Sequence, residues 1–151
     1  MSNKILYVFT LLLLLYSCGT YSEQDKTDFD KKIKNFIKKS GVKYQKSESG
    51  LYYAIETVGE GEFVKLTDEV SFTYEGKLLS GEIFDGENKK KPITFKVNEL
   101  IQGWQEALLY LKKGGKIQLL VPPQLGYGDY ELDDIPVNSI LYFHLEVVDV
   151  N

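Results

Sequence analysis

Apolar and polar residues alternate along three stretches of the chain. Residues 70–74, 117–121 and 141–147 each place an apolar side chain at every other position. A period of two is typical of a β-strand that buries one face. Two further apolar stretches, Leu51–Val58 and Pro92–Val97, predict shorter strands. The last strand is expected to place Leu141, Phe143, Leu145 and Val147 inward, opposite Tyr142, His144 and Glu146.

One helix is clearly indicated between the predicted strands. Trp104, Ala107, Leu108 and Leu111 recur at positions i, i+3, i+4 and i+7, which places them on one helical face. Strands and helices do not alternate as they would in a parallel sheet. The pattern therefore predicts an α+β fold, in which antiparallel strands pack one face against a single short helix.

A second, weaker helical pattern lies near the N-terminus. Apolar residues recur at helical spacing over 29–39, Gly41 ends the pattern, and Thr27 or Asp28 is a candidate N-cap. The polar residues 19–28 predict a flexible tether before this helix. Two interpretations remain open: a short helix packed on the flank of the domain or only partly formed, and a dimer or partner helix. A helix of only about three turns favours the first interpretation, because short helices depend on packing against the rest of a domain.

Composition narrows the functional classes. The chain has 151 residues, is 43% hydrophobic and carries a formal net charge of −4. This length and apolar content fit one domain with a substantial core. All 18 basic residues are lysine, so the bidentate arginine fork is absent. An acidic chain without arginine is poorly suited to binding nucleic acid, and no nucleic-acid partner is expected.

The first residues have the pattern of an export signal. Lys4 is followed by an apolar run that is shorter than the roughly 20 residues a membrane helix needs. Residues 15–18, Leu-Tyr-Ser-Cys, resemble the lipobox of bacterial lipoproteins. The resemblance implies that Cys18, the only cysteine, is acylated and holds the protein on the extracytoplasmic side of a bacterial membrane. The alternative is an ordinary signal peptide with an incidental cysteine.

Most kinds of catalytic chemistry find no support in the sequence. His144, the only histidine, has no second histidine or cysteine nearby, and no Gly-x-Ser-x-Gly motif is present. The acidic residues Glu131, Asp133 and Asp134 do not have calcium-loop spacing and predict a solvated loop. Neither a metal nor a cofactor is expected. Residues 100–128 instead place the only tryptophan before a tyrosine, Tyr127, that stands between two glycines.

Several short motifs, taken in order, resemble the FKBP-type peptidyl-prolyl isomerases. The resemblance covers about residues 48–150 and implies a bent antiparallel sheet wrapped around one short helix. It also implies an isomerase that acts on X–Pro bonds without a cofactor. The motifs are VSFTYEG (70–76), IFD (83–85), LIQGW (100–104), VPPQLGYG (121–128), Ile135-Pro136 and LYF (141–143).

The same resemblance assigns roles to individual residues. Trp104 is expected to form the floor of an apolar pocket, Tyr127 to offer its hydroxyl to a substrate carbonyl, and the backbone N–H of Ile101 to bind another carbonyl. Asp85 is expected to accept a hydrogen bond from Tyr74 beside the bound amide. Phe84, Leu100 and Phe143 complete the walls with Tyr74 and Ile101, Ile135 closes the site, and Ile93 lies at its mouth.

Ile93 also marks a departure, because many family members carry an aromatic residue there. We expect this change to widen the pocket mouth and to weaken the binding of large macrolides.

These observations predict three parts of the chain: a lipoprotein signal peptide (1–17), a tether with a short amphipathic helix (18–47) and an isomerase domain (48–151). The expected function is a monomeric, membrane-anchored prolyl isomerase of the cell envelope that assists the folding of exported, proline-containing polypeptides. The alternative is a non-catalytic chaperone or scaffold module of an envelope complex for motility or secretion. That module would use the same apolar groove.

Overall fold

The structure is a computed structural model that describes residues 20–86 and 91–151. The predicted signal peptide and Cys18 lie outside these residues. Two α-helices, two short 3-10 helices and the strands of one sheet make up the described chain. They are α2 (Glu23–Ser40), β1 (Gln45–Lys46), β2 (Tyr52–Thr57), β3 (Glu69–Leu78), β4 (Ile83–Asp85), β5 (Ile93–Lys96), η1 (Val97–Glu99), α3 (Gln102–Leu108), β6 (Lys116–Val121), η2 (Pro123–Leu125) and β7 (Leu141–Val150).

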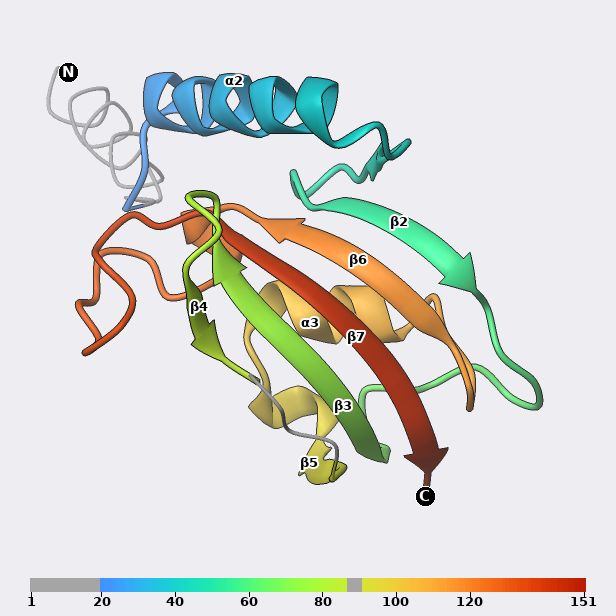
Figure 1. The fold of residues 1–151 in the computed structure, drawn as a ribbon. Coiled ribbons are helices and arrows are strands. Elements are labelled where there is room, and N and C mark those ends of the chain that lie inside the picture. The colour runs from blue at the N-terminus through green and yellow to red at the C-terminus, as the bar shows by residue number, and fades with distance from the viewer. Residues whose placement is uncertain (1–19, 87–90) are drawn as a thin grey trace, which may run out of the picture.

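The sheet is antiparallel and is organised around its two longest strands. Its seven described strands run in the order β1-β2-β6-β7-β3-β4, and β5 pairs with β3 off this path. Strands β3 and β7 pair along their length, from Val70 opposite Val150 to Leu78 opposite Leu141. The sheet curves around α3, which lies against one of its faces (Figure 1). The predicted α+β class and the predicted strands are confirmed.

The two faces of the sheet bury different clusters. On one face, Tyr53, Leu119 and Phe143 are neighbours across β2, β6 and β7, and they pack in the main core with α3. Their chain neighbours form the parallel row on the opposite face, where they pack against α2. The members of this second row are Tyr52, Leu120 and Tyr142.

The β7 alternation was predicted correctly, since Phe143 is 2% exposed and His144 is exposed. Tyr142, however, does not face solvent freely, because the Phe36 ring of α2 lies 6.3 Å from its ring.

Helix α2 starts earlier than the sequence pattern predicts. It begins at Glu23, so residues 23–28 are helical and do not belong to a flexible tether. The N-cap is Ser22, not Thr27 or Asp28: its side chain accepts a hydrogen bond from the backbone N–H of Asp25, whose carboxylate accepts from the Ser22 N–H. This reciprocal cap satisfies backbone donors that would otherwise lack partners. The predicted end is confirmed, because Gly41 has φ 70°.

Helix α2 packs on the domain through its apolar stripe. Phe29 is 7% exposed and Ile33 is 1% exposed, both against the second cluster. Burying such side chains contributes about 1.5–3 kcal/mol each. Since the helix covers a face of its own sheet, packing on the flank of the domain is the interpretation that the structure supports.

The carboxylate of Asp30 ties α2 to the sheet. It accepts hydrogen bonds from the Tyr52 hydroxyl and from Lys46 Nζ at 2.6 Å, and Lys34 lies 2.7 Å away. Burial alone would raise the pKa of this carboxyl, but the bonds from Lys34, Lys46 and Tyr52 outweigh burial and hold the pKa far below its usual range. Its ionised form is therefore the form that stabilises the docked helix.

We expect Asp30→Asn to lower the free energy of unfolding at pH 7 by about 1–2 kcal/mol, because charge-assisted hydrogen bonds to a buried partner are lost. A folded-state pKa below the unfolded-state value of about 4 stabilises the protein at pH values above about 4. This stabilisation diminishes as the pH falls below about 4 and is lost fully only near the lowered folded-state pKa. The difference from wild type should therefore shrink on acidification. Urea unfolding at pH 7 and pH 3 measures both effects.

Asp28→Asn is the matched control, since the bonds that Asp28 makes to described residues stay within α2, with Gln24 and Lys31. A similar loss in both variants at pH 7 would contradict the tie between α2 and the sheet.

Candidate active site

Trp104 lies at the centre of an aromatic cluster on the inner face of the sheet. It is 5% exposed, and three rings meet it edge-on, each with a centroid distance of 5.0 Å. Its indole Nε1 has no hydrogen-bond partner among the described residues. The surroundings of the indole are therefore strongly apolar. The three rings belong to Phe72, Tyr74 and Phe143.

Strand β4 adds an aromatic ring and a carboxylate to this cluster. The Phe84 ring packs edge-on against Phe143 with centroids 5.6 Å apart. The Tyr74 hydroxyl donates a hydrogen bond to the carboxylate of Asp85, which also accepts from the Gly86 N–H at 2.8 Å. Burial, and then the bond to Asp85, raise the pKa of the Tyr74 hydroxyl. Tyr74 therefore stays a neutral donor that fixes the Asp85 side chain.

Two glycines are required by the close packing around β4. A Cβ on Gly76 would come within 2.7 Å of the Phe84 ring. Gly86 has φ 81°, and a Cβ there would come within 2.2 Å of the Tyr74 carbonyl oxygen. Sequence reasoning did not single out either glycine, although Gly76 ends one quoted motif and Gly86 directly follows another. Their positions within those motifs are the signal that was available.

The segment before α3 presents backbone groups beside the cluster. Leu100 and Ile101 are half-buried against the main core. Ile101 is the N-cap of α3, and its carbonyl accepts from the N–H groups of Trp104 and Gln105. The Gln105 side chain donates to the Leu100 carbonyl at 2.7 Å, which holds this segment in place. Gln105 is a positioning residue that sequence reasoning missed.

Tyr127 approaches the cluster from the segment after η2. It is 37% exposed, and burial and the negative charge of Asp85 both raise the pKa of its hydroxyl. The loop that follows Tyr127 is closed at its two ends by a hydrogen bond of 2.9 Å from the Asn138 N–H to the Gly128 carbonyl. We call residues 128–139 the flap.

Ile135 in the flap is 6% exposed and joins the main core, as does the half-buried Ile93 of β5 opposite Phe72.

The structure thus brings five of the predicted site residues into direct contact and places two more around them. The remaining three, Ile93, Leu100 and Ile135, pack against the same core. Their roles toward a substrate stay predictions. The five in contact are Tyr74, Phe84, Asp85, Trp104 and Phe143, and the two beside them are Ile101 and Tyr127.

The other polar groups singled out in the sequence lie on the surface. His144 Nε2 lies 3.2 Å from the carboxylate of Glu56, on the face of the sheet opposite the cluster. Glu131, Asp133 and Asp134 are exposed in the flap. Within residues 20–86 and 91–151, no group of three or more His, Cys, Asp or Glu side chains is placed to hold a metal ion. No helix of that part is long and apolar enough to span a membrane.

Comparison with known proteins agrees with this geometry. Residues 59–148 match the FKBP-type peptidyl-prolyl cis-trans isomerase family. The chain is 47% identical over 120 residues to an isomerase named FkpA from Buchnera aphidicola, covering 78% of this chain and 47% of that protein. It is 41% identical over 133 residues to FkpA of Escherichia coli, and the match covers 85% of this chain and 48% of that protein. The chain therefore belongs to the FKBP-type family, and it spans about half the length of these relatives.

Solved structures give the same result. The crystal structure of FkpA from Escherichia coli superposes with a TM-score of 0.74 at 38% identity, covering 85% of this chain and 62% of that one. The crystal structure of AtFKBP13 superposes with a TM-score of 0.66 at 33% identity, and the match covers 72% of this chain and 99% of that one. The FKBP-like fold that the motifs implied is confirmed.

We expect Asp85→Asn to lower the pKa of both Tyr74 and Tyr127, because the charge that raises both is removed. Both values should stay above the usual range, since burial remains. Titration followed by NMR of ¹³Cζ-labelled tyrosine measures each hydroxyl separately.

Asp129→Asn removes an equal charge and serves as the control, because Asp129 raises the pKa of Tyr21. Equal shifts of Tyr127 in the two variants would contradict the placement of Asp85 beside it.

Proposed function

We propose that the chain catalyses cis–trans isomerisation of X–Pro bonds in exported polypeptides. The observation that carries this proposal is the edge-on enclosure of Trp104 by three rings, with the Tyr74–Asp85 pair and Tyr127 at its border. Family membership supports the same activity. A proline ring fits an apolar aromatic floor, and its flanking carbonyls need donors at the border.

The reaction requires no group that the described site lacks. Rotation about the amide has a barrier of about 18–20 kcal/mol, which arises from resonance between nitrogen and carbonyl. The twisted amide is less polar than the planar one, so removal of water disfavours the planar ground state more. Each ~1.4 kcal/mol of preferential binding to the twisted state accelerates rotation tenfold. An apolar enclosure therefore lowers the barrier without a covalent intermediate.

The donors at the border hold the substrate while the bond turns. We assign the Tyr127 hydroxyl, whose pKa is raised, to one carbonyl of the substrate, and the Ile101 N–H to another. Asp85 keeps its orientation through Tyr74 and Gly86, and we assign its carboxylate to the position beside the rotating amide. Fixing both sides of the bond supplies the orientation on which such catalysis depends.

We expect Phe84→Ala or Asp85→Leu to reduce turnover at least tenfold while the fold is retained. The first opens one wall of the pocket and the second removes the carboxylate beside the amide. A protease-coupled assay with an Ala-Pro-Phe peptide measures the rate, and circular dichroism checks the fold.

Phe63→Ala is the control, since Phe63 is an equally large ring that is 50% exposed in the loop before β3. Unchanged turnover in the Phe84 and Asp85 variants would rule out this site. Tight binding of the peptide without turnover by the wild type would instead identify the non-catalytic chaperone or scaffold module.

We further propose that the mature protein begins at an acylated Cys18 and works at a membrane of the cell envelope. The support is the short apolar run that ends at the Leu-Tyr-Ser-Cys pattern. When the full chain is produced in a bacterium, we expect mass spectrometry to find diacylglycerol on Cys18 and the protein to sediment with membranes.

Cys18→Ser should become soluble and keep its turnover, because this residue is remote in sequence from the site. An unmodified cysteine in the wild type would contradict the anchor.

A further inference from the structure

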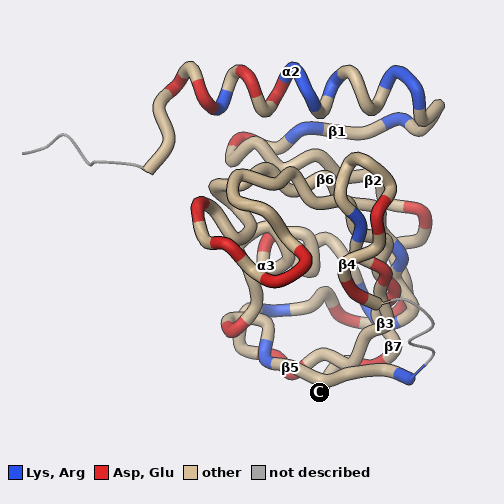
Figure 2. The backbone as a smooth tube through the Cα atoms, turned by 60° about the vertical axis from the view of Figure 1, so that its left-hand side comes forward, with Lys and Arg blue, Asp and Glu red and all other residues tan. Residues whose placement is uncertain are grey.

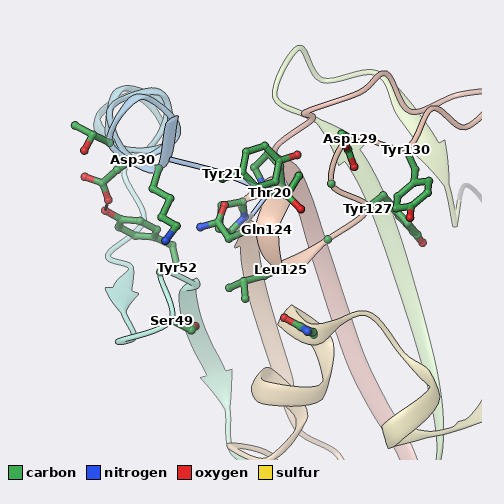
Figure 3. Close-up of a pocket in the computed structure, with 18 of the residues that line it drawn as sticks. Thr20, Tyr21, Asp30, Ser49, Tyr52, Gln124, Leu125, Tyr127, Asp129 and Tyr130 are labelled. Carbon is green, nitrogen blue, oxygen red and sulfur yellow. Dashed lines mark hydrogen bonds between the residues drawn. The ribbon is translucent and has the colours of Figure 1, made fainter. Parts of the chain in front are cut away.

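A cavity of about 1030 Å³ lies between α2 and the η2 segment. Helix α2 forms one wall, the turn between β1 and β2 the base, and the chain from Pro122 to Leu132 the other wall. Figure 3 shows Tyr52 and Asp30 on the α2 side facing Gln124 and Leu125 across the opening. Ligand pockets usually measure about 300–1,000 Å³, so this cavity can hold several residues of a polypeptide.

The cavity and the proposed proline site share one wall. Tyr127 lines the cavity, yet its side chain points away from α2 (Figure 3). The negative charge of Asp85 contributes to the raised pKa of the Tyr127 hydroxyl. Gln102 also lines the cavity and directly follows Ile101. A chain that leaves the proline site over this wall therefore enters the cavity directly.

The lining has an excess of negative charge. It contains five carboxylates and two lysines. Glu23 is paired with Lys26 at 2.7 Å, and Asp30 is tied to Lys46. Within the part of the chain that the structure describes, the other three carboxylates have no ion pair. They belong to Glu48, Asp129 and Glu131. Acidic residues are also visible along the flap in Figure 2.

A polar group in the cavity wall lacks a partner. The Oε1 atom of Gln124 is buried and accepts no hydrogen bond from the described residues. Its Nε2 atom faces Gly50 on the opposite side, 3.5 Å from where a Cβ would stand. A buried acceptor without a donor costs about 1–3 kcal/mol. Because this oxygen has almost no accessible surface, a peptide N–H in the cavity could reach it only after the Gln124 side chain turns.

We propose that this cavity is a second binding site, which holds a lysine- or arginine-bearing segment of the same polypeptide whose prolyl bond occupies the aromatic cluster. The inference rests on the proposed isomerase function and deepens it. The shared wall at Tyr127 provides the continuity, and Glu48 and Glu131 provide the charge that selects a basic segment. Clients with positive charge a few residues from proline are therefore retained longer than neutral ones.

The test compares peptides that share an Ala-Pro-Phe centre. Each carries three lysines or three glutamines, on its N-terminal side in one pair and on its C-terminal side in another. Fluorescence anisotropy measures Kd, and the protease-coupled assay measures turnover of the short peptide alone. At low salt we expect lysine on one of the two sides to lower Kd about three- to tenfold, and 0.5 M salt to remove most of that gain.

Two double variants with the same change of charge locate the effect. Glu48→Gln with Glu131→Gln removes two of the three carboxylates without an ion pair, and should reduce the preference for lysine to less than about twofold while it leaves turnover of the short peptide unchanged. Asp133→Asn with Asp134→Asn alters exposed carboxylates of the same flap that do not line the cavity, and it should keep the preference.

Equal Kd values for lysine and glutamine peptides, or equal loss in both double variants, would overturn the second site. Failure of the isomerase proposal would give a different result: lysine peptides would still bind more tightly than glutamine peptides, but the short peptide would not be turned over.

Discussion

The structure depends on the alternation of side chains along β7 from Leu141 to Val147. This strand lies between β6 and β3, and its side chains point alternately to the face covered by α3 and to the face toward α2. Phe143 meets Trp104 and Phe84, whereas its neighbour Tyr142 meets Phe36 of α2. A shift of register by one residue would exchange the two sets. The site and the docked helix are thus fixed by the same pairing.

Close approach of backbone and rings gives the site its shape. The absence of a side chain at Gly76 leaves room for Phe84, and Gly86 allows the chain to turn directly beside Tyr74. Interiors packed at this density leave little freedom for a ring to change position. The Asp85 carboxylate is held from two sides, by Tyr74 and by the Gly86 N–H. Rigidity here comes from packing and hydrogen bonds together.

The longer strands and the α3 helix were predictable because each has an apolar face, and periodicity reveals such faces directly. The two-residue strand β1, whose side chains are both exposed, and the three-residue strand β4 carry no such pattern. The start of α2 was not, because residues 23–28 are polar throughout and look like a tether. In the helix, the Thr27 hydroxyl bonds the Glu23 carbonyl and the Gln24 amide bonds Asp28. Local bonds of this kind leave no periodic signal. The cavity beside η2 could not be predicted from the sequence either, since it forms only when α2 packs on the sheet.

The start of α2 also fixes how the domain is held by the chain before it. The Tyr21 hydroxyl donates to Asn138 Oδ1 at 2.7 Å, and its ring packs edge-on against Phe29. Thr20 therefore enters the domain beside the base of the flap. The described chain therefore begins at the same end of the molecule as Tyr127. An attached partner or surface would limit from which directions a long polypeptide reaches the site, and would favour chains that emerge close to the point of attachment.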